Sequence, residues 1–171
     1  LVIKSSVISI CVSIVVITFI AAIFFRHLGW GIFAVIPLSA AVILNFGFMG
    51  ILKIDLNHVT ALLSSVIIGV GVDFAIHYIS QYRRLARGKV PVTTRSNRVI
   101  DEVGYPIILD ALSNMAFGAL LFSEFVPLQH MGGLMVFAMF STSFGTLTIL
   151  ASLLELTGRR KKVMKKLLRE Q

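Results

Sequence analysis

Charged side chains are scarce in this sequence, and their scarcity excludes an ordinary soluble domain. Only 14% of the 171 residues are charged, while 57% are hydrophobic. A soluble domain of this length needs a polar shell that such a composition cannot provide. Cysteine is almost absent as well. The single Cys11 allows no internal disulfide and gives no support to redox chemistry.

The motifs of several enzyme and nucleotide-binding classes are also missing. The sequence has no phosphate-binding glycine loop followed by lysine, so ATP-driven activity of this chain has no support. Its four histidines stand in separate places, without the spacing of metal ligands. No Ser-His-Asp set suited to hydrolysis is brought together by the layout described below. We therefore expect no enzyme activity, no cofactor and no metal site.

Long apolar runs are what the sequence does contain. Three of them carry no charge: Ser5–Phe25 with 21 residues, Leu28–Leu52 with 25 and Phe125–Leu154 with 30. About 20 apolar residues are enough for a helix to cross the hydrocarbon core of a bilayer. Residues 56–82 and 103–123 also qualify if each is allowed one aspartate, Asp73 and Asp110.

These runs predict an all-α polytopic membrane protein whose five transmembrane helices form one bundle over residues 1–157. The expected spans are about 2–25, 30–51, 56–82, 105–123 and 126–156. Residues 85–104 are expected to form a segment on the inner membrane surface, because apolar residues recur there at helical spacing among charged ones. Residues 158–171 are expected to be a basic cytoplasmic tail.

The distribution of the basic residues predicts the orientation. If the first span runs from outside to inside, 14 of the 16 lysines and arginines lie on the inner side. The positive-inside rule then places the N-terminus outside and the C-terminus in the cytoplasm. The net charge of +8 is accordingly a topology signal. It does not predict nucleic-acid binding. The chain starts directly at a span without a methionine, so we expect it to be a piece of a longer protein.

Asp73 is the residue that calls most for an explanation. It lies ten residues before Arg83, which places it roughly 15 Å from the inner boundary, near the bilayer midplane. A charged aspartate there costs about 2.5–3.5 kcal/mol on insertion scales. We expect such a residue to have a function and to face the interior of the bundle. Desolvation also favours its neutral form, so it is suited to take up and release protons.

The neighbours of Asp73 at helical spacing extend the candidate site. Ser65, Gly69, Asp73 and His77 follow one another four residues apart and share one side of a helix. Small residues at Ser65, Gly69 and Gly71 are expected to let another helix approach closely. His77 can share a proton with Asp73 or stabilise its charge. The alternative is an interfacial histidine that tolerates its depth.

The fourth span offers a second set of polar residues. Asp110, Ser113 and Asn114 are three and four residues apart and again share one side. Asp110 lies about 8 Å from the inner boundary, nearer to it than Asp73. One carboxylate midway and another nearer the inner surface resemble steps of a proton path, and its candidate residues are Asp73, His77, Asp110 and Asn114. The alternative for Asp110 is a carboxylate hydrated from the inner side. Asn45 is a candidate for a hydrogen bond between helices.

Three stretches carry a resemblance to a known family. They are Gly69-Val-Gly-Val-Asp73-Phe-Ala-Ile-His77, the link Leu52-Lys-Ile-Asp-Leu56-Asn before it, and Gly118 to Pro127 with Gly132-Gly133 beyond. With these stretches the chain resembles the resistance–nodulation–division (RND) superfamily, specifically the MMPL-type and related lipid exporters. The resemblance covers nearly the whole chain as one five-helix block.

The resemblance implies a role and a set of partners. In that family each half has one helix, a large outer domain and then five helices, and the basic tail here favours the C-terminal block. The family's transmembrane aspartate couples transport to protons, and that role transfers to Asp73. The chain departs from the family at Phe74, where tyrosine is common, and at Asp110, where small hydroxyl residues are commoner. The implied setting is the cytoplasmic (inner) membrane of a bacterium.

Three functions are therefore to be compared. The first is a membrane part of a proton-driven RND-type exporter that moves hydrophobic or lipid-like substrates together with a missing half and outer domain. The second is a sterol-sensing-type domain, also of five helices, that binds a lipid and regulates. The third is a structural membrane subunit that assembles with another subunit and transports nothing. Membrane lipids are partners in all three.

Overall fold

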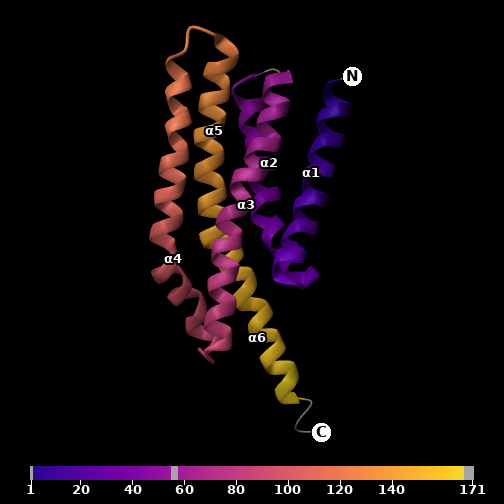
Figure 1. Cartoon of the computed structure of the whole chain (residues 1–171), viewed down its shortest axis with the longest axis vertical. Coiled ribbons are helices and arrows are strands. Elements are labelled where there is room, and N and C mark those ends of the chain that lie inside the picture. The colour runs from indigo at the N-terminus through magenta and orange to yellow at the C-terminus, as the bar shows by residue number, and fades with distance from the viewer. Residues whose placement is uncertain (1, 55–57, 168–171) are drawn as a thin grey trace.

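Long helices that run up and down make up most of the described chain. The computed structural model describes the backbone of residues 2–54 and 58–167 and the side chains of residues 8–54, 63 and 65–160. The helices are α1 (Val2–Phe25), α2 (Leu28–Ile51), α3 (His58–Arg87), α4 (Val92–Asn114), the 3₁₀ segment η1 (Met115–Phe122), α5 (Val126–Gly145), the π-helical turn η2 (Thr146–Leu150) and α6 (Ala151–Leu167). Because η1 continues α4, and η2 joins α5 to α6, the chain forms five rods (Figure 1).

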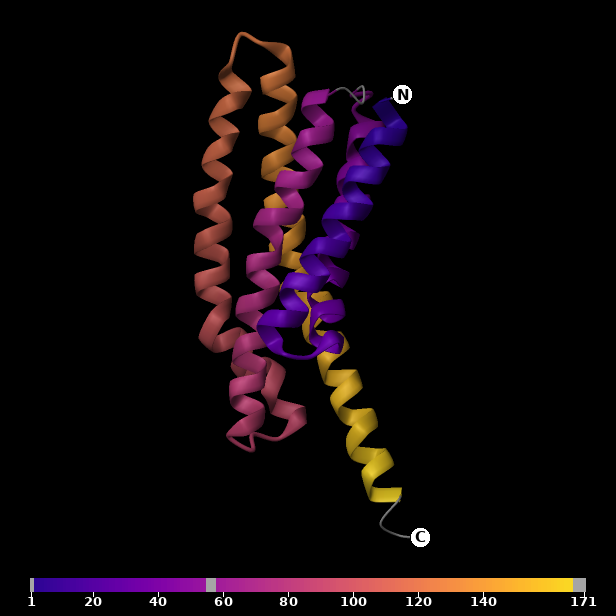
Figure 2. The ribbon, with the colours of Figure 1, turned by 45° about the vertical axis from the view of Figure 1, so that its right-hand side comes forward.

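Four of the rods are long and apolar enough to cross a membrane. They are Ile8–Phe25, Leu28–Ile51, Val92–Phe122 and Val126–Arg160. The remaining rod, α3, has 30 residues and a length of about 45 Å. It packs against α1, α2, α4 and α5, and Figures 1 and 2 show it between α4 and the α1–α2 pair. The prediction of an all-helical, multi-pass membrane bundle is confirmed.

The centre of the bundle is filled by one side of α3. Ile67, Ile68, Phe74, Tyr78 and Ile79 are all almost completely buried there. Because α3 has neighbours on several sides, its large apolar residues fill the space between the other rods.

The helix α2 is joined closely to both α1 and α5. It approaches α1 at Gly31, where an added Cβ atom would lie 2.7 Å from the carbonyl oxygen of Thr18. Its contact with α5 includes a hydrogen bond between helices. The buried side chain of Asn45 donates from Nδ2 to the carbonyl oxygen of Leu134 at 3.0 Å, which joins α2 to α5 as expected.

Residues 85–104 differ from the expectation of a separate segment on the membrane surface. α3 continues to Arg87, and α4 begins at Val92 and runs without a break to Asn114. Leu85 and Val103 of this segment pack against the core of the bundle, and Val99 is completely buried. The hydroxyl of Ser96 is also buried and donates to the carbonyl oxygen of Ala151 at 3.3 Å, which ties α4 to α6.

The first turns of α4 are also tied to α3 by polar side chains. Arg84 and Glu102 form an ion pair at 2.9 Å, and Gln81 donates a hydrogen bond to the same carboxylate. Pro106 lies within α4 and has no backbone N–H, which is a common cause of a bend. Figure 1 shows α4 bent in the lower part of the view, so its first turns follow α3 in a different direction from the rest.

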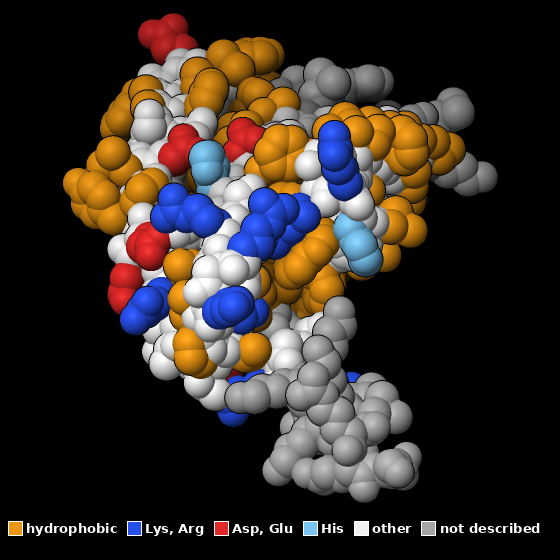
Figure 3. All heavy atoms as spheres, turned by 60° about the horizontal axis from the view of Figure 1, so that its bottom comes forward, with side chains coloured by type: hydrophobic (Ala, Val, Ile, Leu, Met, Phe, Trp, Pro, Cys, Tyr) orange, Lys and Arg blue, Asp and Glu red, His pale blue; other side chains and the backbone are white. Residues whose placement is uncertain are grey.

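Most of the basic side chains gather at one end of the bundle. We call this end, which holds the α1–α2 turn and the α3–α4 turn, the basic end. Figure 3 looks at it and shows Lys and Arg side chains beside hydrophobic ones. The C-terminal rod leaves from the same end, and the first residues of the chain lie at the opposite end (Figure 1). The α6 helix runs into the predicted tail as far as Leu167. Side chains from residue 161 onward, and residues 55–57 of the predicted outer link, lie outside the described part.

The turns that follow α1, α2 and α3 each contain a basic residue in the left-handed backbone region. Arg26, Lys53 and Lys89 have φ values of 53°, 54° and 59°. At the end of α3 the N–H of Val90 donates to the carbonyl oxygen of Leu85 at 3.2 Å, the hydrogen bond expected of a Schellman ending. Glycine is the usual residue at such a position, because a side chain in this backbone region is strained.

Candidate functional site

The predicted polar stripe of α3 lies on the outside of the bundle. Asp73, His77 and Gly69 are exposed, whereas Phe74 and Tyr78 are completely buried. The expectation that Asp73 faces the interior of this five-helix block is therefore wrong. The reason lies in packing, because the large side chains of α3 occupy the interior and leave the stripe of small and polar residues on the opposite side.

The two glycines of this segment have different surroundings. A Cβ atom added to Gly71 would lie 2.6 Å from Cδ1 of Leu38 and 2.9 Å from Cγ2 of Thr142, so α3 is in close contact with α2 and α5 there. A Cβ atom added to Gly69 would meet nothing within 4 Å. Ser65 is half-buried. Within the described chain, the outer face of α3 at Gly69 has open space beside it.

The four candidate proton-path residues fall into two separate pairs. Among the described residues, no hydrogen bond or ion pair joins Asp73 to His77, or either of them to Asp110 or Asn114. On α4 the side chain of Asn114 donates from Nδ2 to the backbone oxygen of Asp110 at 2.9 Å and to its Oδ1 atom at 3.0 Å. Asp110 is exposed like Asp73. A continuous path through these residues stays a prediction.

The exposed stripe of α3 continues to the basic end. Ser80, Arg84 and Arg87 are exposed at the helical spacing that Asp73 and His77 begin. Ser80, Arg83, Arg84 and Arg87 line a shallow hollow of about 360 Å³ together with Phe24 and Phe25 of α1. One face of α3 therefore carries a carboxylate, an imidazole, a hydroxyl and two guanidinium groups in succession.

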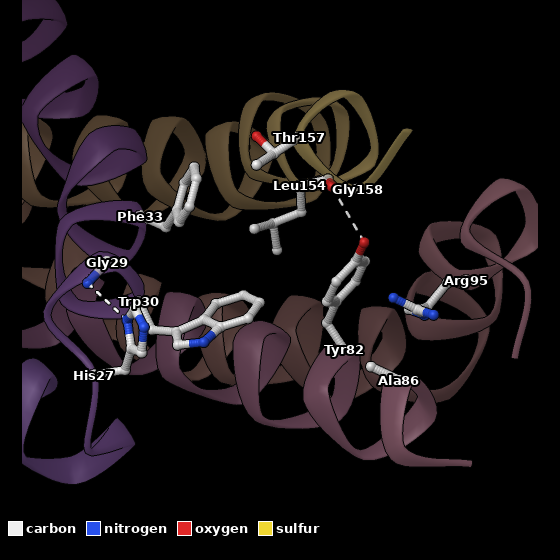
Figure 4. A pocket seen from close by; sticks show the side chains of 10 residues that line it. All are labelled: His27, Gly29, Trp30, Phe33, Tyr82, Ala86, Arg95, Leu154, Thr157 and Gly158. Carbon is white, nitrogen blue, oxygen red and sulfur yellow. Dashed lines mark hydrogen bonds between the residues drawn. The ribbon is translucent and has the colours of Figure 1, made fainter. Parts of the chain in front are cut away.

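A second, more enclosed cavity lies between four helices at the basic end (Figure 4). It has a volume of about 230 Å³. Trp30 and Phe33 of α2, Tyr82 of α3 and Leu154 of α6 form its apolar walls, and Arg95 of α4 lies behind the Tyr82 ring. The remaining lining residues are His27, Gly29, Ala86, Thr157 and Gly158.

Hydrogen bonds and stacking hold the walls of this cavity in place. The hydroxyl of Tyr82 donates to the carbonyl oxygen of Leu154 at 3.1 Å, which fixes α3 to α6. Arg83 donates from Nη1 to the carbonyl oxygen of Phe25 at 3.0 Å, and its guanidinium lies 5.7 Å from the centre of the Trp30 ring. The α1–α2 turn is closed by His27, whose Nδ1 accepts a hydrogen bond from the N–H of Gly29 at 3.2 Å.

Sequence reasoning did not find this cavity. Trp30 stands out in the sequence only as a residue typical of a membrane interface, and Arg95 only as one of many inner basic residues. The lining residues are spread from position 27 to position 158, and only the packing of four helices brings them together.

Comparison with known proteins places the chain in a family. Residues 26–169 match the family described as the sterol-sensing domain of SREBP cleavage-activation. This match covers most of the chain, so the chain belongs to the sterol-sensing domain family and is a membrane domain connected with lipids. It is also similar to membrane protein MJ1562 of Methanocaldococcus jannaschii, with 28% identity over 149 residues. The match covers 86% of this chain and 38% of that protein.

Proposed function

We propose that the chain is one five-helix half of the membrane domain of a proton-driven RND-type exporter of hydrophobic or lipid-like molecules. The observation that carries this proposal is the outward position of Asp73 on α3. An aspartate that faces lipid near the bilayer midplane costs about 2.5–3.5 kcal/mol. A second helical half that covers this face would remove the contact with lipid, and the free space at Gly69 allows its close approach.

The outward position of Asp73 also allows its protonation to be coupled to a movement of the two halves. At an interface between two halves, its ionised form favours an arrangement in which water or a cation reaches it. Its protonated form favours a tighter, drier contact. Alternate protonation from the two sides of the membrane then shifts the halves between two arrangements. In this proposal His77, one helical turn nearer the basic end, passes the proton onward, and Asp110 and Asn114 form the second half of the path.

The orientation in this proposal follows from charge. The basic end faces the cytoplasm, because most lysines and arginines gather there. The missing half and the outer domain belong to the rest of a longer protein in the cytoplasmic membrane. Support comes from the curated relative, since the matched region is only 38% of its length and leaves room for such parts.

Transport by the Asp73→Asn variant of the full-length protein tests the proposal. The protein is reconstituted in vesicles with an imposed proton gradient, and the movement of a lipophilic fluorescent dye and of a fluorescent lipid analogue is followed. We expect Asp73→Asn to abolish gradient-dependent movement while insertion and folding stay intact. Asp101→Asn, which changes an exposed carboxylate on the first turns of α4, is the matched control and keeps transport. Gradient-driven movement at the wild-type rate in Asp73→Asn contradicts the proposal.

A lipid-binding regulatory domain is the second candidate, and the family match over residues 26–169 favours it. In that case a lipid binds without regard to the proton gradient, and Asp73 has no part in binding. Lipid binding to wild type and Asp73→Asn with equal affinity, combined with no gradient-driven movement in either, supports this second function over the first.

A further inference from the structure

The cavity at the basic end contains a guanidinium group whose hydrogen bonds are incomplete. Arg95 donates from Nη2 to the carbonyl oxygen of Val90 at 2.7 Å. Its guanidinium carbon lies 5.1 Å from the centre of the Tyr82 ring, so the group is held in place by stacking. Its Nε atom is buried and has no acceptor among the described residues. A buried donor without an acceptor is unfavourable, so the arrangement calls for an added acceptor.

The charges around Arg95 favour an anionic acceptor. None of the described residues that line the cavity is acidic, and two of them, Arg95 and His27, carry basic groups. Two of the carboxylates on the neighbouring helices are already paired, Glu102 with Arg84 at 2.9 Å and Glu155 with Arg159 at 2.6 Å. The planar guanidinium matches a carboxylate better than it matches a neutral hydroxyl.

The rest of the cavity favours an apolar chain. Its walls are the rings of Trp30, Phe33 and Tyr82 and the side chain of Leu154 (Figure 4). A volume of about 230 Å³ is smaller than most pockets for drug-sized ligands, so it suits a head group with the first carbons of one chain. The side chains of Trp30 and Arg95 are also of the kind that lies at the boundary between lipid and water, where single-chain amphiphiles are concentrated.

We propose that this cavity binds a single-chain amphiphile with a carboxylate head, such as a long-chain fatty acid, whose carboxylate pairs with the guanidinium of Arg95 while its first carbons lie against Trp30 and Phe33. This site is separate from the Asp73 face and does not depend on proton-driven export. Its occupancy links α2, α3, α4 and α6, the four helices that line the cavity.

The fluorescence of Trp30 provides a direct test, because this residue is the only tryptophan of the chain and lines the cavity. The 171-residue chain is reconstituted in vesicles of unbrominated phosphatidylcholine. A dibrominated fatty acid is added at low mole fraction, and its bromines quench a nearby tryptophan. We expect saturable quenching by the fatty acid that an excess of unbrominated fatty acid reverses. A dibrominated fatty alcohol of the same chain length should bind at least about tenfold more weakly, because it lacks the anionic head.

Variants test whether the quenching of Trp30 fluorescence comes from binding in this cavity. Arg95→Gln should weaken binding of the fatty acid about tenfold and remove the preference for acid over alcohol. Arg98→Gln is the matched control, because it removes an exposed arginine three residues further along the same helix. It should leave the affinity unchanged.

Ala86→Leu fills the cavity without changing Arg95 and should abolish saturable quenching. If Arg95→Gln does not show the cooperative thermal unfolding of the wild type, and so is not folded, Ala86→Leu tests the proposal in its place. Non-saturable quenching that is equal for acid and alcohol overturns the proposal. Wild-type affinity in both Arg95→Gln and Ala86→Leu, or tighter binding of a neutral sterol competitor than of the fatty acid, also overturns it.

Discussion

The close approach of α1 and α2 at Gly31 makes a quantitative prediction about stability. A Cβ atom at Gly31 would lie 2.7 Å from the carbonyl oxygen of Thr18 and 2.9 Å from the backbone nitrogen of Ala22. Both atoms belong to the backbone of α1, whose own hydrogen bonds prevent a local adjustment. The Gly31→Ala substitution must therefore push the two helices apart, and overpacking of this kind costs about 1–3 kcal/mol.

A second glycine of α2 is a matched control for this change. A Cβ atom at Gly47 would meet nothing within 4 Å, so Gly47→Ala makes no clash. Both substitutions gain the same helix propensity, about 1 kcal/mol, and this gain cancels in the comparison. The difference between the two variants is therefore the cost of overpacking alone. For a chain of this size, about 2 kcal/mol corresponds to a difference of about 4–8 °C in thermal midpoint.

Thermal unfolding of the two variants in the same detergent, followed by circular dichroism, measures this difference. We expect Gly31→Ala to melt below the wild type or close to it, and Gly47→Ala to melt above it. Equal thermal midpoints for the two variants would refute the reasoning, because they would show that α1 and α2 are not in backbone contact at Gly31.

Two further changes test the helix ends and the polar contact inside the bundle. Lys89→Gly should raise the thermal midpoint, because it relieves about 1 kcal/mol of left-handed backbone strain. Lys89→Ala keeps the Cβ atom and should not raise the midpoint. Equal midpoints for the two variants would contradict the left-handed backbone conformation of Lys89. Asn45→Ala should lower the stability by about 0.6–1.7 kcal/mol, because it removes the hydrogen bond from Nδ2 to Leu134 that joins α2 and α5. Leu44→Ala, which changes an exposed neighbour, should lower the stability less. A larger loss of stability in Leu44→Ala than in Asn45→Ala would show that this hydrogen bond contributes little.

The all-helical, multi-pass character of the chain was predictable because it depends on a local quantity. A run of about 20 apolar residues is visible in the sequence whatever it packs against. The ends of the rods were less predictable. The pattern around Val99 predicts an amphipathic helix, but the same pattern suits a helix on a membrane surface and a helix packed on two others. The burial of Val99 and the hydrogen bond from Ser96 to Ala151 show that this helix packs on other helices.

The direction in which Asp73 points could not be predicted from periodicity. Spacing shows that Gly69, Asp73 and His77 share a side of α3, but it does not show which side faces inward. In a soluble protein the apolar side of a helix faces the core, and this rule resolves the ambiguity. A helix in lipid has apolar surroundings on both sides, so hydrophobicity no longer distinguishes the interior from the exterior. The large residues Phe74 and Tyr78 fill the interior, and the polar stripe is left outside.

This outward stripe connects the fold to the proposed function. An exposed Asp73 is unfavourable for a five-helix block that is alone in a bilayer. Gly71 lies on a different side of the same helix turn and is closely packed inside the block. The block thus has a stable core of its own and one face that is poorly suited to lipid. If a second half covers that face, Asp73 lies at an interface, where a change of its charge alters the contact between two bodies rather than the core of one. Because the core does not have to rearrange, such a position allows protonation to move the halves while each block keeps its fold.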